Sequence, residues 1–175
     1  PMTDLGGALR RIWTEGRRVE KAAYAVGAVL FLSGLVHVAV LLVAGRTWIG
    51  PLSLRKAATF GLSFGLTLPS VAWATSFLRL RARGLVLGVF LVACVVETVL
   101  VTLQAWRGVP SHFNFETPFD TSVSMTLALG GGVIVLVGIV CTVAASRAGG
   151  RSRRACASPC GPGSSCCSSR WGRAR

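Results

Sequence analysis

The chain has 175 residues, of which 52% are hydrophobic and only 14% are charged, and its formal net charge is +13. A soluble domain usually carries about a quarter charged residues, so this composition disfavours a soluble protein. The charges avoid four long windows, which is typical of membrane-spanning segments. Because the basic residues lie in short segments beside those windows, we attribute the positive charge to orientation in a bilayer and contact with anionic headgroups. It does not indicate nucleic-acid binding.

The first 21 residues form a basic leader before the first apolar window. Its apolar side chains recur at helical spacing, at Leu5, Leu9, Ile12 and Trp13. This pattern indicates a short helix lying in the headgroup plane. Three glycines weaken such a helix, so a solvated leader that only flanks the first span remains the alternative.

The four apolar windows predict an all-α bundle of four transmembrane helices in residues 22–145. The spans are about 22–44, 57–78, 85–103 and 121–145. The first has 23 residues without a formal charge, and at about 1.5 Å per residue it crosses a hydrocarbon core of about 30 Å.

Glycine and proline mark two of these spans. In the second, Gly61 and Gly65 form a G-x-x-x-G motif, which permits close approach of a neighbouring helix. Pro69 in the same span is expected to kink the helix, with Ser or Thr side chains satisfying the freed backbone groups. Three successive glycines at 130–132 allow either close packing or a local break in the fourth span.

Residues 146–175 form a basic tail rich in Ser and Cys, and we predict that it is disordered. Its four cysteines are Cys156, Cys160, Cys166 and Cys167. Their spacing matches no zinc module, so no metal site is expected. The composition also resembles an out-of-frame translation of GC-rich DNA, in which case the native chain would continue differently.

The distribution of Lys and Arg predicts the orientation of the bundle. There are five in the leader, three in residues 45–56, three in 79–84, one in the 104–120 connector and seven in the tail. Positive residues favour the cytoplasmic side. We therefore expect a multi-pass protein of the inner (plasma) membrane, with both termini cytoplasmic and the connector outside.

Two ionisable residues, His37 and Glu97, lie inside predicted spans. Counted from the span midpoints, His37, Ser63, Thr67 and Glu97 fall in one depth band in the outer half of the bundle. Gln104 continues the Glu97 face of the third helix toward the connector. Two interpretations stay open: a proton-relay or ligand-binding cluster, or hydrogen bonds that only hold helices together.

The connector from Gln104 to Thr121, QAWRGVPSHFNFETPFDT, has the highest density of chemically specific residues. Helix signals explain its two ends. Gly108 ends the third helix, and Thr117 at the N-cap, followed by Pro118 and an acid at position 120, opens the fourth.

The remaining connector residues are candidates for a functional loop on the outer face. They are Arg107, Ser111, His112, Asn114 and Glu116. Arg107 is expected to pair with Glu116 or Glu97.

The pattern Q-A-W-R-G-x-x-S-H-F-N-x-x-T-P-x-D in the connector resembles a stretch in polytopic membrane proteins of bacteria, actinobacteria especially. The resemblance extends across residues 22 to about 145, including R-K-A-x-x-F-G-L-S-F-G-L at 55–66, and leaves out the tail. It implies a bacterial multi-pass protein that forms part of a larger bundle, and it implies no particular activity.

The function expected first is a small transport bundle, or a proton- or ligand-handling bundle or part of one, working through Glu97 and His37. One alternative is a structural or assembly protein of the membrane. Another is a haem or redox subunit with His37 and His112 as axial ligands, although no cofactor is otherwise expected. No serine lies in a nucleophile motif such as G-x-S-x-G, so no catalytic residue is predicted. Expected partners are the bilayer and further membrane helices or a second copy.

Overall fold

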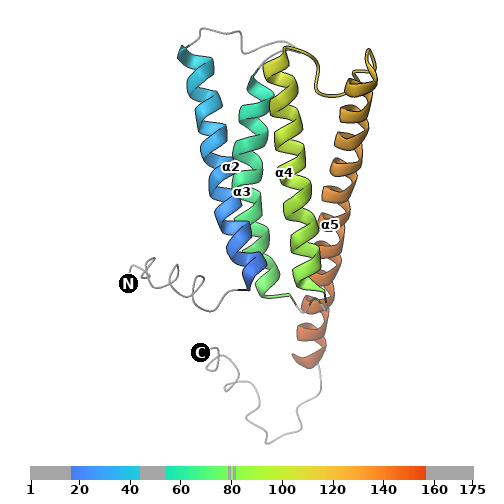
Figure 1. The fold of residues 1–175 in the computed structure, drawn as a ribbon. Coiled ribbons are helices and arrows are strands. Elements are labelled where there is room, and N and C mark those ends of the chain that lie inside the picture. Colours follow the sequence, from blue (N-terminus) through green and yellow to red (C-terminus); the bar gives the residue numbers. More distant parts are fainter. Residues whose placement is uncertain (1–16, 44–53, 79, 81, 157–175) are drawn as a thin grey trace, which may run out of the picture.

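A computed structural model describes residues 17–43, 54–78, 80 and 82–156 of the chain, and this part is all-helical. Its helices are α2 (Arg18–Val43), α3 (Arg55–Ser76), α4 (Arg83–Arg107) and α5 (Pro118–Cys156). Each contains a stretch long and apolar enough to cross a membrane. Successive helices run antiparallel, with the start of α2 and the end of α5 at one end of the bundle (Figure 1). The prediction of a four-helix transmembrane fold is confirmed.

The fourth helix differs most from its predicted span. It begins three residues earlier and continues to Cys156, whereas disorder was predicted from residue 146. The apolar pattern does end near Ala145, but Ala and Arg are good helix formers, and extending a helix costs less than starting one. The helix also continues unbroken through the three glycines at 130–132. The predicted leader helix falls almost wholly on residues 1–16, and the other tail cysteines on 157–175, which lie outside the described residues.

The two helices in closest contact, α2 and α3, meet through glycine. A Cβ atom added to Gly65 would lie 2.6 Å from the backbone nitrogen of Phe31, and one added to Gly61 would lie 2.8 Å from the Cα of Gly34. One added to Gly27 would lie 2.8 Å from the ring of Pro69. The backbones therefore touch along the whole G-x-x-x-G face, as the motif predicted. Helix α3 continues through Pro69, and its kink stays a prediction.

Helix α4 docks on this pair and is fixed near its first turn by Arg83. The Arg83 guanidinium forms an ion pair of 3.0 Å with Glu20 of α2 and donates a 3.0 Å hydrogen bond to the carbonyl oxygen of Ala72 in α3. Further along, Leu87, Phe90 and Cys94 enter a core shared with the other helices. Arg83 thus joins three helices at the first turn of α4, and α4 begins at the end of the bundle opposite the connector (Figure 1).

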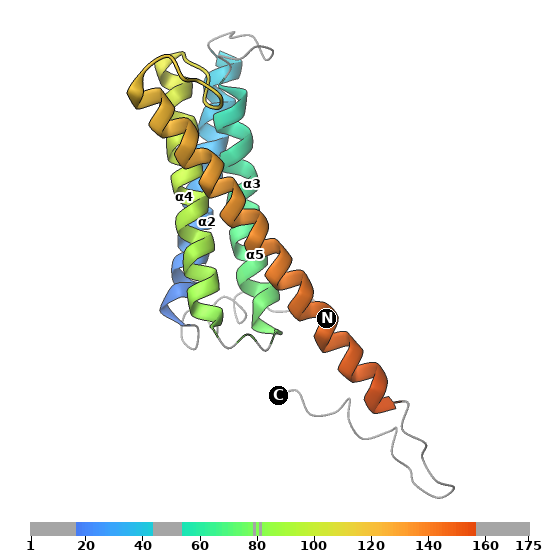
Figure 2. The same ribbon diagram turned by 90° about the vertical axis from the view of Figure 1, so that its right-hand side faces the viewer.

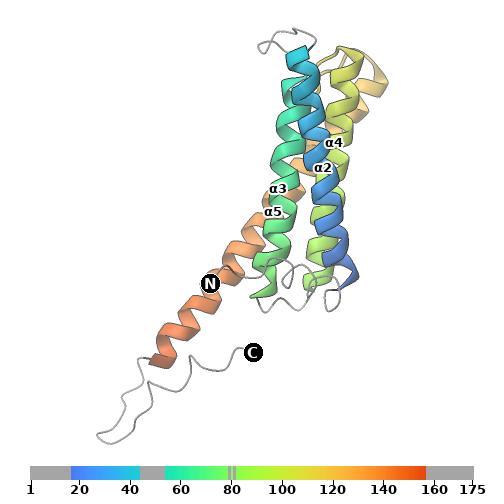
Figure 3. The same ribbon diagram turned by 90° about the vertical axis from the view of Figure 1, so that its left-hand side faces the viewer.

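Helix α5 is the least enclosed. Only 11% of its most apolar window is buried, against 28–39% in the other three helices. Figures 2 and 3 show it crossing the bundle at a steep angle, so that its last turns extend away from the other helices. The connector end of α5 is therefore held by its neighbours, while its other end has few contacts with the described part of the chain.

The contact between α2 and α3 predicts a sharp difference between two glycines. Gly65→Ala forces α2 away from α3, so it should lower the free energy of unfolding by about 1–3 kcal/mol, the usual cost of overpacking. Gly84→Ala is the matched control, because a Cβ there meets nothing within 4 Å. Thermal unfolding of the detergent-purified protein measures both. Equal midpoints for the two variants would contradict the close contact.

Candidate functional site

Both ends of the α4–α5 connector follow the predicted helix signals. Gly108 adopts a left-handed conformation with φ of 69°, and the backbone N–H of Val109 donates to the carbonyl oxygen of Gln104 over 3.1 Å. This is the pattern of a Schellman ending, in which glycine avoids the steric cost of positive φ. At the other end, the backbone N–H of Asp120 donates to the hydroxyl of Thr117 over 3.1 Å, so Thr117 caps α5 as predicted.

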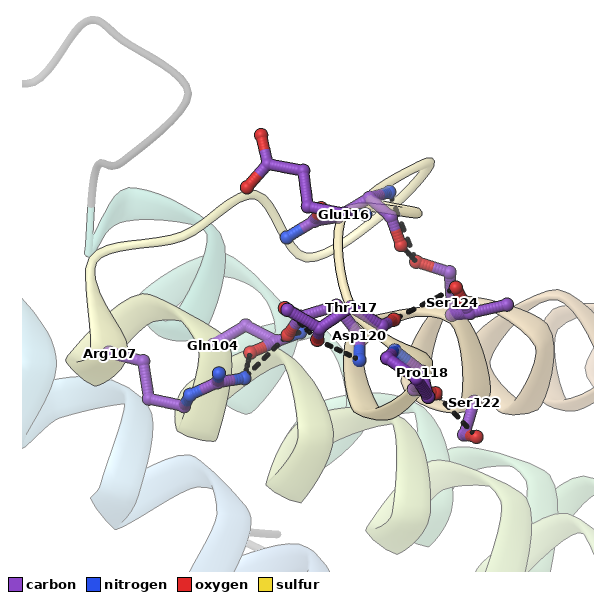
Figure 4. Close-up of polar contacts among 10 residues, drawn as sticks. Gln104, Arg107, Glu116, Thr117, Pro118, Asp120, Ser122 and Ser124 are labelled. Carbon is purple, nitrogen blue, oxygen red and sulfur yellow. Dashed lines mark hydrogen bonds and ion pairs between the residues drawn. The ribbon is translucent and has the colours of Figure 1, made fainter.

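The carboxylate of Asp120 does more than cap a helix, because it is the centre of a buried network. One oxygen, Oδ1, accepts hydrogen bonds from Gln104 Nε2 at 3.0 Å and from Arg107 Nη1 at 2.6 Å. The other oxygen accepts from the Thr117 hydroxyl at 2.7 Å. Figure 4 shows these side chains directed at Asp120, which is only 3% exposed. The network ties the last turn of α4 to the first turn of α5.

Arg107 therefore has a different partner from the one predicted. The expected pairing with Glu116 or Glu97 is wrong, because the guanidinium pairs with Asp120 and also lies 4.8 Å from the centre of the Phe119 ring. Asp120 follows the cap by three residues, so its carboxylate turns back toward the end of α4. In contrast, Glu116 is exposed, and its side chain points away from the network (Figure 4).

The middle of the connector is fastened to α5 by Asn114 and Ser124. The backbone N–H of Asn114 donates to Ser124 Oγ over 3.2 Å, and the same hydroxyl donates to the Asn114 carbonyl over 3.1 Å. Asn114 Oδ1 accepts from the backbone N–H of Glu116, whereas the buried Nδ2 has no partner within the described chain. Asn114 is thus mainly a loop-shaping residue, with one donor unused.

A second polar group joins α3 to the connector. Lys56 Nζ lies 3.5 Å from Ser111 Oγ, and this hydroxyl lies 3.0 Å from Nδ1 of His112. The His112 ring also lies against Phe60, with 6.3 Å between ring centres. Burial, and secondly the charge of Lys56, hold the pKa of His112 below its ordinary value of 6.5. The imidazole is therefore neutral at pH 7.

His37 forms a helix-to-helix hydrogen bond. Its Nδ1 lies 2.7 Å from the carbonyl oxygen of Ser33, and its Nε2 accepts from Trp106 Nε1 over 3.1 Å. Because Trp donates only, the ring hydrogen of a neutral His37 must be on Nδ1. Both nitrogens are then occupied, so the axial-ligand role considered for His37 would require breaking the bond to Trp106.

Glu97 is, with Asn114, one of two buried polar residues that have an unpaired side-chain atom in the described chain. It is 3% exposed, and its Oε1 has no hydrogen-bond partner among the described residues. The carboxyl faces Gly130 of α5, where an added Cβ would lie only 2.5 Å from Oε1. The first of the three consecutive glycines therefore makes the space that the Glu97 side chain fills.

An apolar crevice of about 530 Å³ opens between α4 and α5 beside Glu97. Its walls include Val89, Ala93 and Val96 of α4 and Leu129 and Gly130 of α5. Gly130 both lines the crevice and faces the carboxyl, so the Glu97 carboxyl lies close behind the crevice wall.

The predicted intramembrane cluster is thus divided. Ser63 and Thr67 lie on an exposed face of α3, where the Thr67 hydroxyl donates to the carbonyl oxygen of Ser63. Gln104 belongs to the Asp120 network, and no contact joins His37 to Glu97 among the described residues. Depth along a helix follows from its rise of about 1.5 Å per residue, but the direction of each side chain depends on helix rotation, which depth does not determine.

Sequence reasoning missed the roles of Lys56, Trp106 and the Asp120 carboxylate. A usable signal existed for Lys56, because the predicted topology places residues 45–56 and the connector at the same membrane face. The capping pattern already explained Asp120, so its second role, as the acceptor for Gln104 and Arg107, was not predicted.

Comparison with protein-family models, with characterised proteins and with solved structures gives no match for this chain.

The Asp120 network predicts that Asp120→Ala lowers the free energy of unfolding by about 1–3 kcal/mol, because buried donors of Gln104 and Thr117 lose their acceptor. The ion pair with Arg107 contributes less to this loss, because the Arg107 side chain is 37% exposed and water screens its charge. Glu116→Gln removes an exposed carboxylate from the same connector and should leave stability unchanged. Thermal unfolding compares the two variants, and equal midpoints would show that the network contributes nothing.

The group at Lys56 predicts a change in the titration of His112. Lys56→Gln removes a neighbouring positive charge, so the pKa of His112 should rise toward 6.5, while burial keeps it from reaching that value. Side-chain NMR of the two histidines measures this, with His112→Gln assigning the signals. Because the folded pKa is the lower one, the unfolded state takes up the proton first, and stability should fall as pH decreases below about 6.5. An unchanged pKa of His112 in Lys56→Gln would contradict the proximity of the Lys56 ammonium to the His112 ring.

Proposed function

We propose that the protein is a membrane-embedded transport bundle, or a proton- or ligand-handling one, that works through Glu97. The observation that carries this proposal is the buried Glu97 carboxyl, whose Oε1 has no partner in the described chain. An intramembrane carboxyl costs about 2.5–3.5 kcal/mol on insertion scales, and such residues usually serve function or pair with one another. No hydrogen bond within the described chain explains why Oε1 is buried.

The surroundings of Glu97 support binding of a proton or of a donor group. No basic side chain of the described chain pairs with it, so an ionised carboxylate would lie in an apolar setting without a counter-charge. The group is stabilised by taking up a proton, or by a hydrogen-bond donor on a molecule that enters the crevice. Gly130 lines the crevice and also faces the carboxyl, which gives such a molecule a short path.

The arrangement of α5 supports a gated path to this carboxyl. The glycine contacts and Arg83 join α2, α3 and α4 firmly, while α5 is held chiefly at its connector end. A change in the tilt of α5 would widen or close the crevice while leaving the other three helices in place. Glu97 would then change its exposure while the glycine contact between α2 and α3 stays in place.

His37 is no longer part of the proposed relay. Its bond to Trp106 joins α2 to the end of α4, and this supports the second candidate function, a structural or assembly protein in which buried polar residues hold helices together. The two functions differ in what they expect of Glu97, because only the first requires that it exchange a proton or ligand.

We also propose that the bundle lies in a bacterial cytoplasmic membrane, with the connector outside and both termini in the cytoplasm. The support is the unequal distribution of Lys and Arg over the segments between spans, together with the resemblance of the connector to polytopic bacterial proteins. The exposed apolar side chains of α5, such as Leu129 and Val135, favour contact with lipid or with further helices.

Proton flux through reconstituted vesicles tests the proposed function. The purified protein is inserted into vesicles that contain a pH-sensitive dye, and a potassium gradient with valinomycin provides the driving force. Wild type should carry protons faster than empty vesicles, and Glu97→Gln should reduce the flux to that of empty vesicles, because the amide cannot exchange a proton. Glu116→Gln, which changes a carboxylate in the connector, should retain the flux.

A second measurement separates proton handling from a purely structural role. Infrared difference spectra after a pH step should contain a carboxyl band that disappears in Glu97→Gln. Equal flux in wild type and Glu97→Gln would sink the proton-handling proposal, as would a wild type no faster than empty vesicles and without that band. If Glu97→Gln instead only lowers the unfolding midpoint, the structural alternative is favoured.

A further inference from the structure

A group of donors lies at the connector end, away from Glu97. Ser111 Oγ lies between the Lys56 ammonium, at 3.5 Å, and His112 Nδ1, at 3.0 Å. Ser111 is 3% exposed, whereas Lys56 and His112 are half-buried. The buried hydroxyl thus holds two partly open nitrogen groups side by side.

Among the described residues, the hydrogen-bond pattern leaves these groups with unused donors. Lysine has three N–H donors, and the contact with Ser111 uses one of them. Because the Ser111 oxygen accepts from Lys56, its own hydrogen is available for Nδ1 of the neutral His112. In the tautomer in which Nδ1 accepts this hydrogen, the ring hydrogen is on Nε2. Spare N–H groups on Lys56 and His112 suit a ligand with several acceptor oxygens and a negative charge.

The start of α3 adds a positive field at the same place. The helix begins with Arg55 and Lys56, has no acidic residue in its first turn, and has an N-cap residue, Leu54, whose apolar side chain cannot cap. Helix N-termini carry partial positive charge and orphan N–H groups. The Lys56 ammonium adds to the positive charge at this end, and an oxyanion would offset both.

The surrounding surface indicates where such an oxyanion comes from. Phe113 is 87% exposed and Phe115 is 55% exposed, although both rings are apolar. Phe113 also has φ of 58°, a conformation that costs free energy and tends to occur at functional sites. Both rings extend from a loop at the end of the spans, which is the level of lipid headgroups. Exposed apolar side chains at this level favour contact with a bilayer.

We propose that Lys56, Ser111 and His112 form a binding site for the phosphate group of an anionic phospholipid headgroup. The Lys56 ammonium and His112 Nε2 donate to the phosphate oxygens, and Ser111 keeps the two donors together. Phe113 and Phe115 lie against the lipid beside the headgroup. The burial of the Ser111 oxygen favours this positioning role, and no covalent step is involved.

The test compares the lipids that stay bound to variants purified in detergent after expression and exposure to equal amounts of phosphatidylglycerol and phosphatidylcholine. Native mass spectrometry counts the bound lipids. Wild type should retain phosphatidylglycerol preferentially, and Lys56→Gln should reduce that preference about fivefold, the usual effect of one Lys near an anionic surface. Lys56→Arg should restore most of it. Lys21→Gln is the matched control, because Lys21 is a half-buried lysine at the opposite end of the bundle.

Histidine NMR identifies the source of the phosphate. Adding phosphatidylglycerol to the micelles should shift the His112 ring signals, and Ser111→Ala should weaken that shift. A shift with inorganic phosphate alone would keep the site and assign it to soluble phosphate. Equal lipid preference in wild type and Lys56→Gln, with a normal unfolding midpoint and no His112 shift from either source, would overturn the proposal. So would a loss of preference in Lys21→Gln that matches the loss in Lys56→Gln.

Discussion

The backbone contact between α2 and α3 is the constraint on which the rest of this bundle depends. In a membrane, apolar side chains gain little by leaving lipid, so close packing has to supply the attraction between helices. Glycines at 27, 34, 61 and 65 bring two backbones into contact along most of their length. Once this pair is formed, Arg83 and the His37–Trp106 hydrogen bond attach α4 at its two ends. Helix α5 is attached to α4 at its first turn through Asp120, and its far end has no such side-chain bond among the described residues.

Most buried polar groups of the described spans and connector have hydrogen-bond partners, and two side-chain atoms, Glu97 Oε1 and Asn114 Nδ2, have none. Asp120 gathers the donors of Gln104, Arg107 and Thr117, and His37 uses both ring nitrogens. Such groups stabilise the fold and need no further explanation. Glu97 differs from Asn114 because it lies within a span, where a carboxyl is costly. The glycine opposite makes room for its carboxyl, although Oε1 has no donor among the described residues. The functional interpretation therefore moves from a cluster to a single carboxyl and its crevice.

The sequence allowed the spans, the glycine contact and the helix signals at Gly108 and Thr117 to be predicted. These depend on local pattern and on hydropathy, which a single chain displays directly. The contacts of Arg107 and His37 could not be predicted, because they depend on the rotation of one helix against another. The extension of α5 past Ala145 was missed for a different reason. The apolar pattern reports where lipid ends, whereas a helix ends where its residues no longer favour it.

The two proposed sites lie at different depths and depend on the same element. Asp120 and Ser124 fasten the first turns of α5 to α4 and to the connector, and Glu97 faces α5 at Gly130, a little further along. The Lys56 group contacts the connector at Ser111 and His112, between the end of α4 and Asn114. A lipid bound there would steady the connector and, through it, the fixed end of α5. The tilt of α5, and with it the exposure of Glu97, would then depend on the headgroup present at the membrane surface.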